Sequence, residues 1–162
     1  MYESTLSKLS CKYSLKYFSL ENKSKKSTAV TYTPQEMSEK KKITLEYEVN
    51  SSPKILFGFL SEPNGLSQWF ADEVIYRDQI FIFIWDGEEH KAKLVTSKEN
   101  KLVRFKWLDD DPQHYFEMEV LQDELTNDVA LAITDFAPED TIDERKLIWD
   151  NQIQYLIRVL GV

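Results

Sequence analysis

Residues 49–74 read VNSSPKILFGFLSEPNGLSQWFADEV, and this stretch predicts two short consecutive helices. Ser52 is a favoured N-cap residue and Pro53 suits the first helical position, so a helix is expected to begin there and to end near the second proline. An Asn-Gly turn signal then precedes a second apolar helical pattern over residues 66–70. The stretch therefore predicts two helices, one directly after the other.

Strand patterns lie on both sides of this two-helix stretch. Before it, residues 43–49 alternate between apolar and polar side chains, which is the period of a half-buried strand. After it come six more segments of strand length, at 74–76, 80–85, 90–96, 102–108, 114–122 and 129–136. Short turn sequences join these segments, which favours an antiparallel meander of consecutive strands.

The chain ends in a long amphipathic pattern over residues 138–160. No helix breaker follows Pro138, and Trp149, Ile153 and Leu156 recur at helical spacing. A sheet with one apolar face needs a cover, and this helix is long and apolar enough to provide it. The predicted fold is α+β: a curved seven-stranded antiparallel sheet wrapped around the C-terminal helix, with two short helices between strands 1 and 2.

Composition narrows the class of protein. The chain is 42% hydrophobic and 13% aromatic, which is sufficient for one packed core. Its 28 acidic and 20 basic residues give a net charge of −8, which disfavours a nucleic-acid partner. One cysteine and two histidines exclude an internal disulfide and leave too few ligands for a Cys/His zinc site. We expect a cytoplasmic protein with no cofactor, no metal and no integral membrane association, since no apolar run reaches the roughly 18 residues of a membrane span.

The first 36 residues differ in composition from the rest. They hold six lysines and three glutamates, a net charge of +3, whereas residues 37–162 carry −11. All four tryptophans and all four glycines follow Met37. Residues 1–36 are therefore predicted to be a basic, Ser/Lys-rich extension, either disordered or added by an upstream start assignment. The folded domain is expected over 37–162.

Residues 42–162 resemble the helix-grip superfamily, which includes START lipid-transfer domains, birch-pollen allergens and polyketide cyclases. The resemblance lies in the two-helix stretch, in LVRFKW at 102–107, in TDF at 134–136 and in the terminal helix. Within the superfamily, the chain is most similar to bacterial proteins related to the activator of the ninety-kilodalton heat-shock-protein ATPase. The resemblance implies a cavity between sheet and helix that holds a lipid or another apolar ligand.

The sequence departs from that family in two respects. Family members commonly have a Gly-rich turn before the third strand, whereas residues 76–89 contain only Gly87. The chaperone activators also use a separate N-terminal domain and a basic docking surface. Neither is evident in a chain whose body carries −11. Chaperone activation is therefore not the expected function.

Strand parity and helix spacing together give a predicted cavity lining. It comprises Trp69, Phe105, Trp107, Phe116, Met118, Leu131, Ile133, Asp135, Trp149, Ile153 and Leu156. The alternative is a solid core that these large side chains fill completely. Asp135 is a candidate acid, base or ligand anchor at the cavity mouth, or else a hydrated residue at a strand end. His90 and His114 are expected as rim residues at the starts of two strands.

Three functions remain open. The favoured one is non-catalytic binding of a small hydrophobic or amphipathic ligand, either a lipid or an aromatic metabolite. The alternatives are a cyclase/dehydratase-type enzyme using the same cavity, and a co-chaperone-like interaction module with a filled core and a protein partner or a homodimer. No triad or dyad spacing is present, so no catalytic residue is predicted. Two convergent titratable groups in the cavity would favour the enzyme. A purely apolar cavity would favour the binding protein, and a filled core would favour the interaction module.

Overall fold

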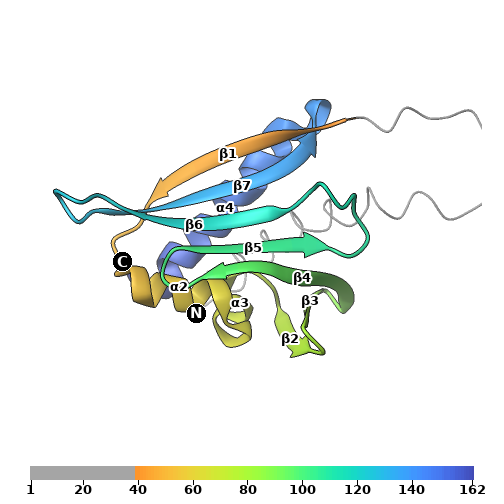
Figure 1. The fold of residues 1–162 in the computed structure, drawn as a ribbon, viewed down its shortest axis with the longest axis horizontal. Helices are drawn as coiled ribbons and strands as arrows, with labels where there is room; N and C mark the ends of the chain where they lie inside the picture. The colour runs from red at the N-terminus through yellow and green to blue at the C-terminus, as the bar shows by residue number, and fades with distance from the viewer. Residues whose placement is uncertain (1–38) are drawn as a thin grey trace, which may run out of the picture.

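The computed structural model describes residues 39–162, so the extension predicted over 1–36 lies outside the described residues. One sheet and three α-helices make up this part of the chain (Figure 1). The elements follow in the order β1 (Lys40–Glu48), α2 (Pro53–Ser61), α3 (Pro63–Trp69), β2 (Glu73–Arg77), β3 (Ile80–Trp85), β4 (Glu88–Lys98), β5 (Leu102–Trp107), β6 (Phe116–Gln122), β7 (Val129–Pro138), the 3₁₀ turn η1 (Glu139–Thr141) and α4 (Ile142–Leu160).

The sheet has the strand order β1-β7-β6-β5-β4-β3-β2, and every neighbouring pair is antiparallel. Strands β2 to β7 therefore form the predicted meander, and β1 joins its far end by pairing with β7. Figure 1 shows α4 crossing one face of the sheet behind β7 and β6, with α2 and α3 at one end. The predicted α+β helix-grip architecture is confirmed.

The two short helices form for the reasons that the sequence indicated. Ser52 Oγ accepts a hydrogen bond from the Ile55 N–H at 3.3 Å, and Pro53 occupies the first helical turn. Gly65 then allows α3 to pack tightly on α2, because a Cβ at this position would lie 2.3 Å from the Gly58 carbonyl oxygen. The close approach fixes the angle between the helices and buries Leu66 in the core.

Several element boundaries differ from the prediction: β1, for example, begins at Lys40 rather than at Ile43. Two later starts are delayed for a local reason. The strand expected from His114 begins at Phe116, because Asp111 accepts hydrogen bonds from the backbone N–H groups of Gln113 and His114 and so holds a turn there. The helix expected from Pro138 begins at Ile142, after the 3₁₀ turn. In both places, local hydrogen bonds at an acidic loop displace the start of the regular element.

Aromatic side chains dominate the core between the sheet and α4. Strand β3 contributes Phe81, Phe83 and Trp85, all of which are buried in this core. Phe105 and Phe116 from the next strands stack with ring centroids 5.0 Å apart. A register shift between Leu94 and Thr96 marks a bulge in β4, which bends the sheet around this core.

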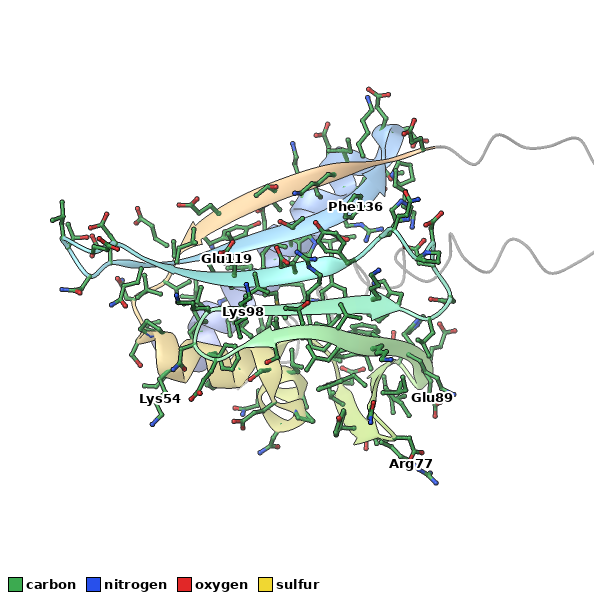
Figure 2. All side chains as sticks on the ribbon, viewed as in Figure 1. Lys54, Arg77, Glu89, Lys98, Glu119 and Phe136 are labelled. Carbon is green, nitrogen blue, oxygen red and sulfur yellow. The ribbon has the colours of Figure 1, made fainter. Side chains whose placement is uncertain are left out.

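The outer face of the sheet carries polar side chains on several strands, although β3 also places Ile80, Ile82 and Ile84 on it. Lys98 and Glu119 lie on this face, in front of the sheet as Figure 2 is drawn. Glu117, on the same face, is buried because Arg104 covers it, with Nε 2.5 Å from Glu117 Oε2. The Arg104 guanidinium in turn lies 4.2 Å from the centre of the Tyr115 ring.

Candidate ligand-binding cavity

A small cavity lies between α4 and the sheet, close to the end of α3. Its volume is about 10 Å³, near the lower limit for holding one water molecule. The lining comes from the C-cap residue of α3, from three strands and from α4: Phe70, Trp85, Trp107, Phe116, Ile148, Trp149 and Gln152. Six of these seven side chains are apolar or aromatic, so the cavity has the composition of a site for an apolar molecule.

Aromatic rings pack closely around this cavity. Phe70 lies between the sheet and the helix, with its ring centre 5.7 Å from that of Phe116 and 6.0 Å from that of Trp149. Trp107 stacks on Phe116 at 4.9 Å. These contacts account for the small volume, because the rings occupy most of the space between sheet and helix.

Gln152 is the polar member of the lining. Its side chain is 1% exposed, and its Nε2 donates to the Phe70 carbonyl oxygen over a long distance of 3.4 Å. Within residues 39–162, the Gln152 Oε1 atom has no hydrogen-bond partner. The amide orientation follows from chemistry, since only the NH₂ group can donate to a carbonyl. An unsatisfied buried acceptor of this kind costs about 1–3 kcal/mol, which a ligand with a donor group would recover.

Asp135 does not line the cavity. It is 4% exposed, and its Oδ2 accepts the Trp149 indole N–H at 2.9 Å and an Arg145 N–H at 3.3 Å. Its Oδ1 accepts the backbone N–H of Phe136 at 2.8 Å. The carboxylate therefore compensates the buried Arg145 charge and fixes the ring of Trp149, which forms one wall of the cavity.

The two histidines lie in different surroundings. His90 lies inside β4, with its ring centre 5.4 Å from that of Trp85 and 6.5 Å from that of Trp107, two of the lining residues. His114 lies in the loop before β6, with its Nδ1 3.3 Å from Asp110 Oδ1.

Asp110 also joins this loop to the start of β1, because its Oδ2 accepts from Lys40 Nζ at 2.8 Å. Burial by itself would raise the pKa of Asp110, but the bonds from Lys40, the Asp111 N–H and His114 more than offset it and lower the pKa below the ordinary value.

Three of the eleven predicted lining residues border this cavity: Trp107, Phe116 and Trp149. The others are buried around it without lining it: Trp69, Phe105, Met118, Leu131, Ile133, Asp135, Ile153 and Leu156. Sequence reasoning missed Phe70, Trp85, Ile148 and Gln152. For Gln152 a signal was present, since it lies three residues after Trp149 and four before Leu156, in the apolar stripe of the helix.

The described residues form no metal centre. Among residues 39–162, no group of three or more His, Cys, Asp or Glu side chains is arranged to hold a metal ion. No helix in this range has the length and apolar character needed to cross a membrane.

Comparison with proteins of known structure finds several with a similar fold. BfR322 from Bacteroides fragilis is 41% identical, with a TM-score of 0.57, over 76% of this chain and 93% of its own. The Aha1 dimer from Colwellia psychrerythraea is 16% identical, with a TM-score of 0.63, over 75% of this chain and 96% of its own. CalU16 from Micromonospora echinospora is 14% identical, with a TM-score of 0.57, over 72% of each chain. The last two similarities concern the fold alone.

Comparison with curated protein sequences gives no match. The model of the START-like superfamily domain, in contrast, matches residues 37–162, which include every strand and helix described above. The chain belongs to the START-like superfamily.

Proposed function

We propose that this protein binds a small, flat, mainly apolar molecule that carries one hydrogen-bond donor, without transforming it. The observation that carries the proposal is Gln152 Oε1, a buried acceptor without a partner among the described residues, in a lining whose other six side chains are apolar or aromatic. A ligand hydroxyl or N–H directed at this oxygen would satisfy it. The aromatic walls favour an aromatic metabolite over a lipid chain, because flat rings stack on one another.

The lining favours binding over acid–base catalysis. None of its seven side chains is titratable in the neutral range. Asp135 already compensates the charge of Arg145 and accepts the Trp149 N–H, so using it as an acid or base would disrupt the packing of α4. A cyclase-type reaction needs convergent titratable groups in the cavity, and its lining supplies none.

Binding requires the cavity to enlarge, because about 10 Å³ holds no more than a water molecule. The Gln152 amide is the group that can give way most easily. The Phe70 carbonyl oxygen already accepts the Trp85 indole N–H at 2.8 Å, so it loses little if the 3.4 Å bond from Gln152 breaks. The Gln152 amide is then available to bind the ligand.

Two matched pairs of probes test this proposal: phenol with toluene, and indole with indene. Within each pair the shapes are nearly equal, but only phenol and indole carry a donor. We expect phenol and indole to bind about tenfold more tightly than their partners, because only they satisfy the buried acceptor. Dissociation constants come from NMR titration of the tryptophan indole resonances.

Two variants of α4 test whether Gln152 causes the tighter binding of probes that carry a hydrogen-bond donor. Gln152→Leu should abolish the preference for phenol over toluene while retaining toluene binding. Gln154→Leu is the matched control, because Gln154 is exposed on the same helix. Absence of binding by all four probes would contradict the proposal and favour the filled-core interaction module. A donor preference that persists in Gln152→Leu would show that Gln152 is not the anchor.

A further inference from the structure

Strand β2 forms a free edge of the sheet. It follows β3 at the end of the strand order and, among the described strands, pairs with no other. Its side chains are accessible: Ile75 is 38% exposed and Tyr76 is 53% exposed. A free edge with an apolar centre is a template for pairing with another strand.

The β2–β3 turn determines which backbone groups face this edge. Asp78 and Gln79 form a two-residue loop and both have positive φ, at 53° and 65°, as in a type I′ turn. In such a hairpin the residues that flank the loop, here Arg77 and Ile80, form a hydrogen-bonded pair. Hydrogen-bonded and non-hydrogen-bonded residues alternate along an antiparallel strand. Val74 and Tyr76 therefore direct their N–H and C=O groups toward the free edge.

The sequence of β2, Glu73-Val-Ile-Tyr-Arg77, is complementary to itself in the antiparallel direction. A twofold axis through Ile75 would place Glu73 opposite Arg77 of a second copy, and Arg77 opposite Glu73. It would also pair Val74 with Tyr76 of the second copy, the residues whose backbone groups are directed outward. We propose that β2 pairs with β2 of a second copy of this chain, which joins the two sheets into one.

Charges on the neighbouring strands reinforce this complementarity. In the observed register, Glu73 and Glu89 lie in one row across the sheet, and Arg77 and Lys93 lie in another. Residues in one row share a face of the sheet. The twofold axis therefore brings the acidic row of one copy against the basic row of the other. Figure 2 shows Arg77 projecting from the hairpin into open space, where a second copy can reach it.

The size of the contact sets the expected affinity. A five-residue edge pair covers much less than the roughly 1,200 Å² of a standard stable interface, so this dimer is weak and forms at high protein concentration. Arg77 Nε lies 3.5 Å from Asp78, but both side chains are strongly exposed and can exchange partners at small cost. The symmetry of the strand selects a second copy over an unrelated protein, because both charged rows are satisfied simultaneously.

Charge reversal with the full chain tests the proposal. Glu73→Arg alone places arginine opposite arginine, and Arg77→Glu alone places glutamate opposite glutamate. Each variant should raise the dimer dissociation constant about tenfold. An equimolar mixture of the two variants restores opposite charges, as does the double variant Glu73→Arg/Arg77→Glu, so both should recover the wild-type constant. Sedimentation equilibrium over about 10 μM to 1 mM covers the range expected for a small interface.

Two further measurements complete the test. Ile75→Lys should abolish association, whereas Leu125→Lys, at a residue that is 93% exposed in the β6–β7 turn, should leave it unchanged. Hydrogen exchange at the Val74 and Tyr76 amides should slow as protein concentration rises. A wild-type monomer at about 1 mM, or a mixture that associates no better than the single variants, would overturn the proposal. Protection of those amides independent of concentration would show that another segment of the same chain occupies the edge, which also overturns it.

Discussion

The indole N–H of Trp149 donates to Asp135 Oδ2 at 2.9 Å, and this bond joins α4 to β7 within the core. The same oxygen accepts from Arg145, one helical turn before Trp149. A residue that the sequence presented as a candidate catalytic acid therefore holds the helix against the sheet. It also sets the position of the tryptophan ring that forms one wall of the cavity.

Removing this carboxylate should destabilise the protein strongly. Asp135→Ala removes the carboxylate that accepts from both the buried Arg145 and Trp149, which is expected to cost about 3–5 kcal/mol in the free energy of unfolding. Asp135→Asn should cost less, because its amide oxygen still accepts the Trp149 N–H. Urea unfolding followed by tryptophan fluorescence measures both effects. Asp128→Asn, in an exposed turn, is the control, and a loss in Asp135→Ala no larger than in this control would refute the role of Asp135.

The close packing of α2 and α3 predicts opposite effects for two glycine substitutions. Gly65→Ala places a methyl group 2.3 Å from the Gly58 carbonyl oxygen and should cost about 1–3 kcal/mol in stability through overpacking. Gly58→Ala meets no atom closer than 4.0 Å, and alanine has the higher helix propensity, so stability should rise by up to about 1 kcal/mol. Thermal unfolding compares the two variants, and equal effects would contradict the packing described here.

The β2–β3 turn predicts a stabilising substitution. Gln79 has φ of 65°, in the left-handed region that residues with a Cβ adopt at a cost. Gln79→Gly removes that cost, at the expense of a more flexible unfolded chain, and should stabilise the fold by about 0.5–1 kcal/mol. The midpoint of urea unfolding is the measurement. A midpoint lower than that of the wild type would show that the turn carries no strain.

Tyr47 gives a predicted dependence of stability on alkaline pH. Burial, then the hydrogen bond from its hydroxyl to Asp150 Oδ1 at 2.7 Å, and then the charge of Asp150 raise the pKa of Tyr47 well above its ordinary value. The folded protein thus retains this proton at a pH at which the unfolded chain loses it. Its contribution is complete below the unfolded pKa of about 10 and is lost as pH rises above that value.

A comparison of two Tyr→Phe variants isolates this effect. Tyr47→Phe should lose less stability than the wild type between about pH 9 and pH 11, because it has no phenol to ionise. Tyr76→Phe, at an exposed tyrosine, should follow the wild type. Chemical unfolding at each pH, at low protein concentration, supplies the data. If the free energy of unfolding of Tyr47→Phe falls with pH in parallel with that of the wild type, ionisation of Tyr47 is not the cause of the loss.

The fold could be predicted because its patterns are local. Alternation marked β1, the Ser-Pro pair marked the start of α2, and helical spacing marked α4, each within a few residues. The Gly-rich turn that family members commonly have before the third strand is not needed here, since Asp78 and Gln79 adopt positive φ without glycine. At the acidic loops before β6 and α4, the regular elements begin later than predicted, because local hydrogen bonds hold turns that apolar periodicity does not indicate.

The cavity was harder to predict because its lining depends on distant contacts. Strand β3 reads IFIFIW and is apolar on both faces, so no alternation showed that Trp85 rather than Ile84 points inward. Gln152 was passed over because polar side chains are usually placed outside, although its position in the helix was correct for burial. The side-chain partners of Asp135 lie ten and fourteen residues away on another element, and only the folded chain brings them together.

Native mass spectrometry of the protein purified from its own host, followed by denaturing extraction, tests the ligand-binding claim most directly. We expect one small, largely aromatic compound, bound in a one-to-one ratio and carrying a hydroxyl or N–H group. Gln152→Leu purified in the same way should lose it, and Gln154→Leu should keep it. A protein mass with nothing bound, together with no thermal shift from phenol or indole, would contradict ligand binding in this cavity.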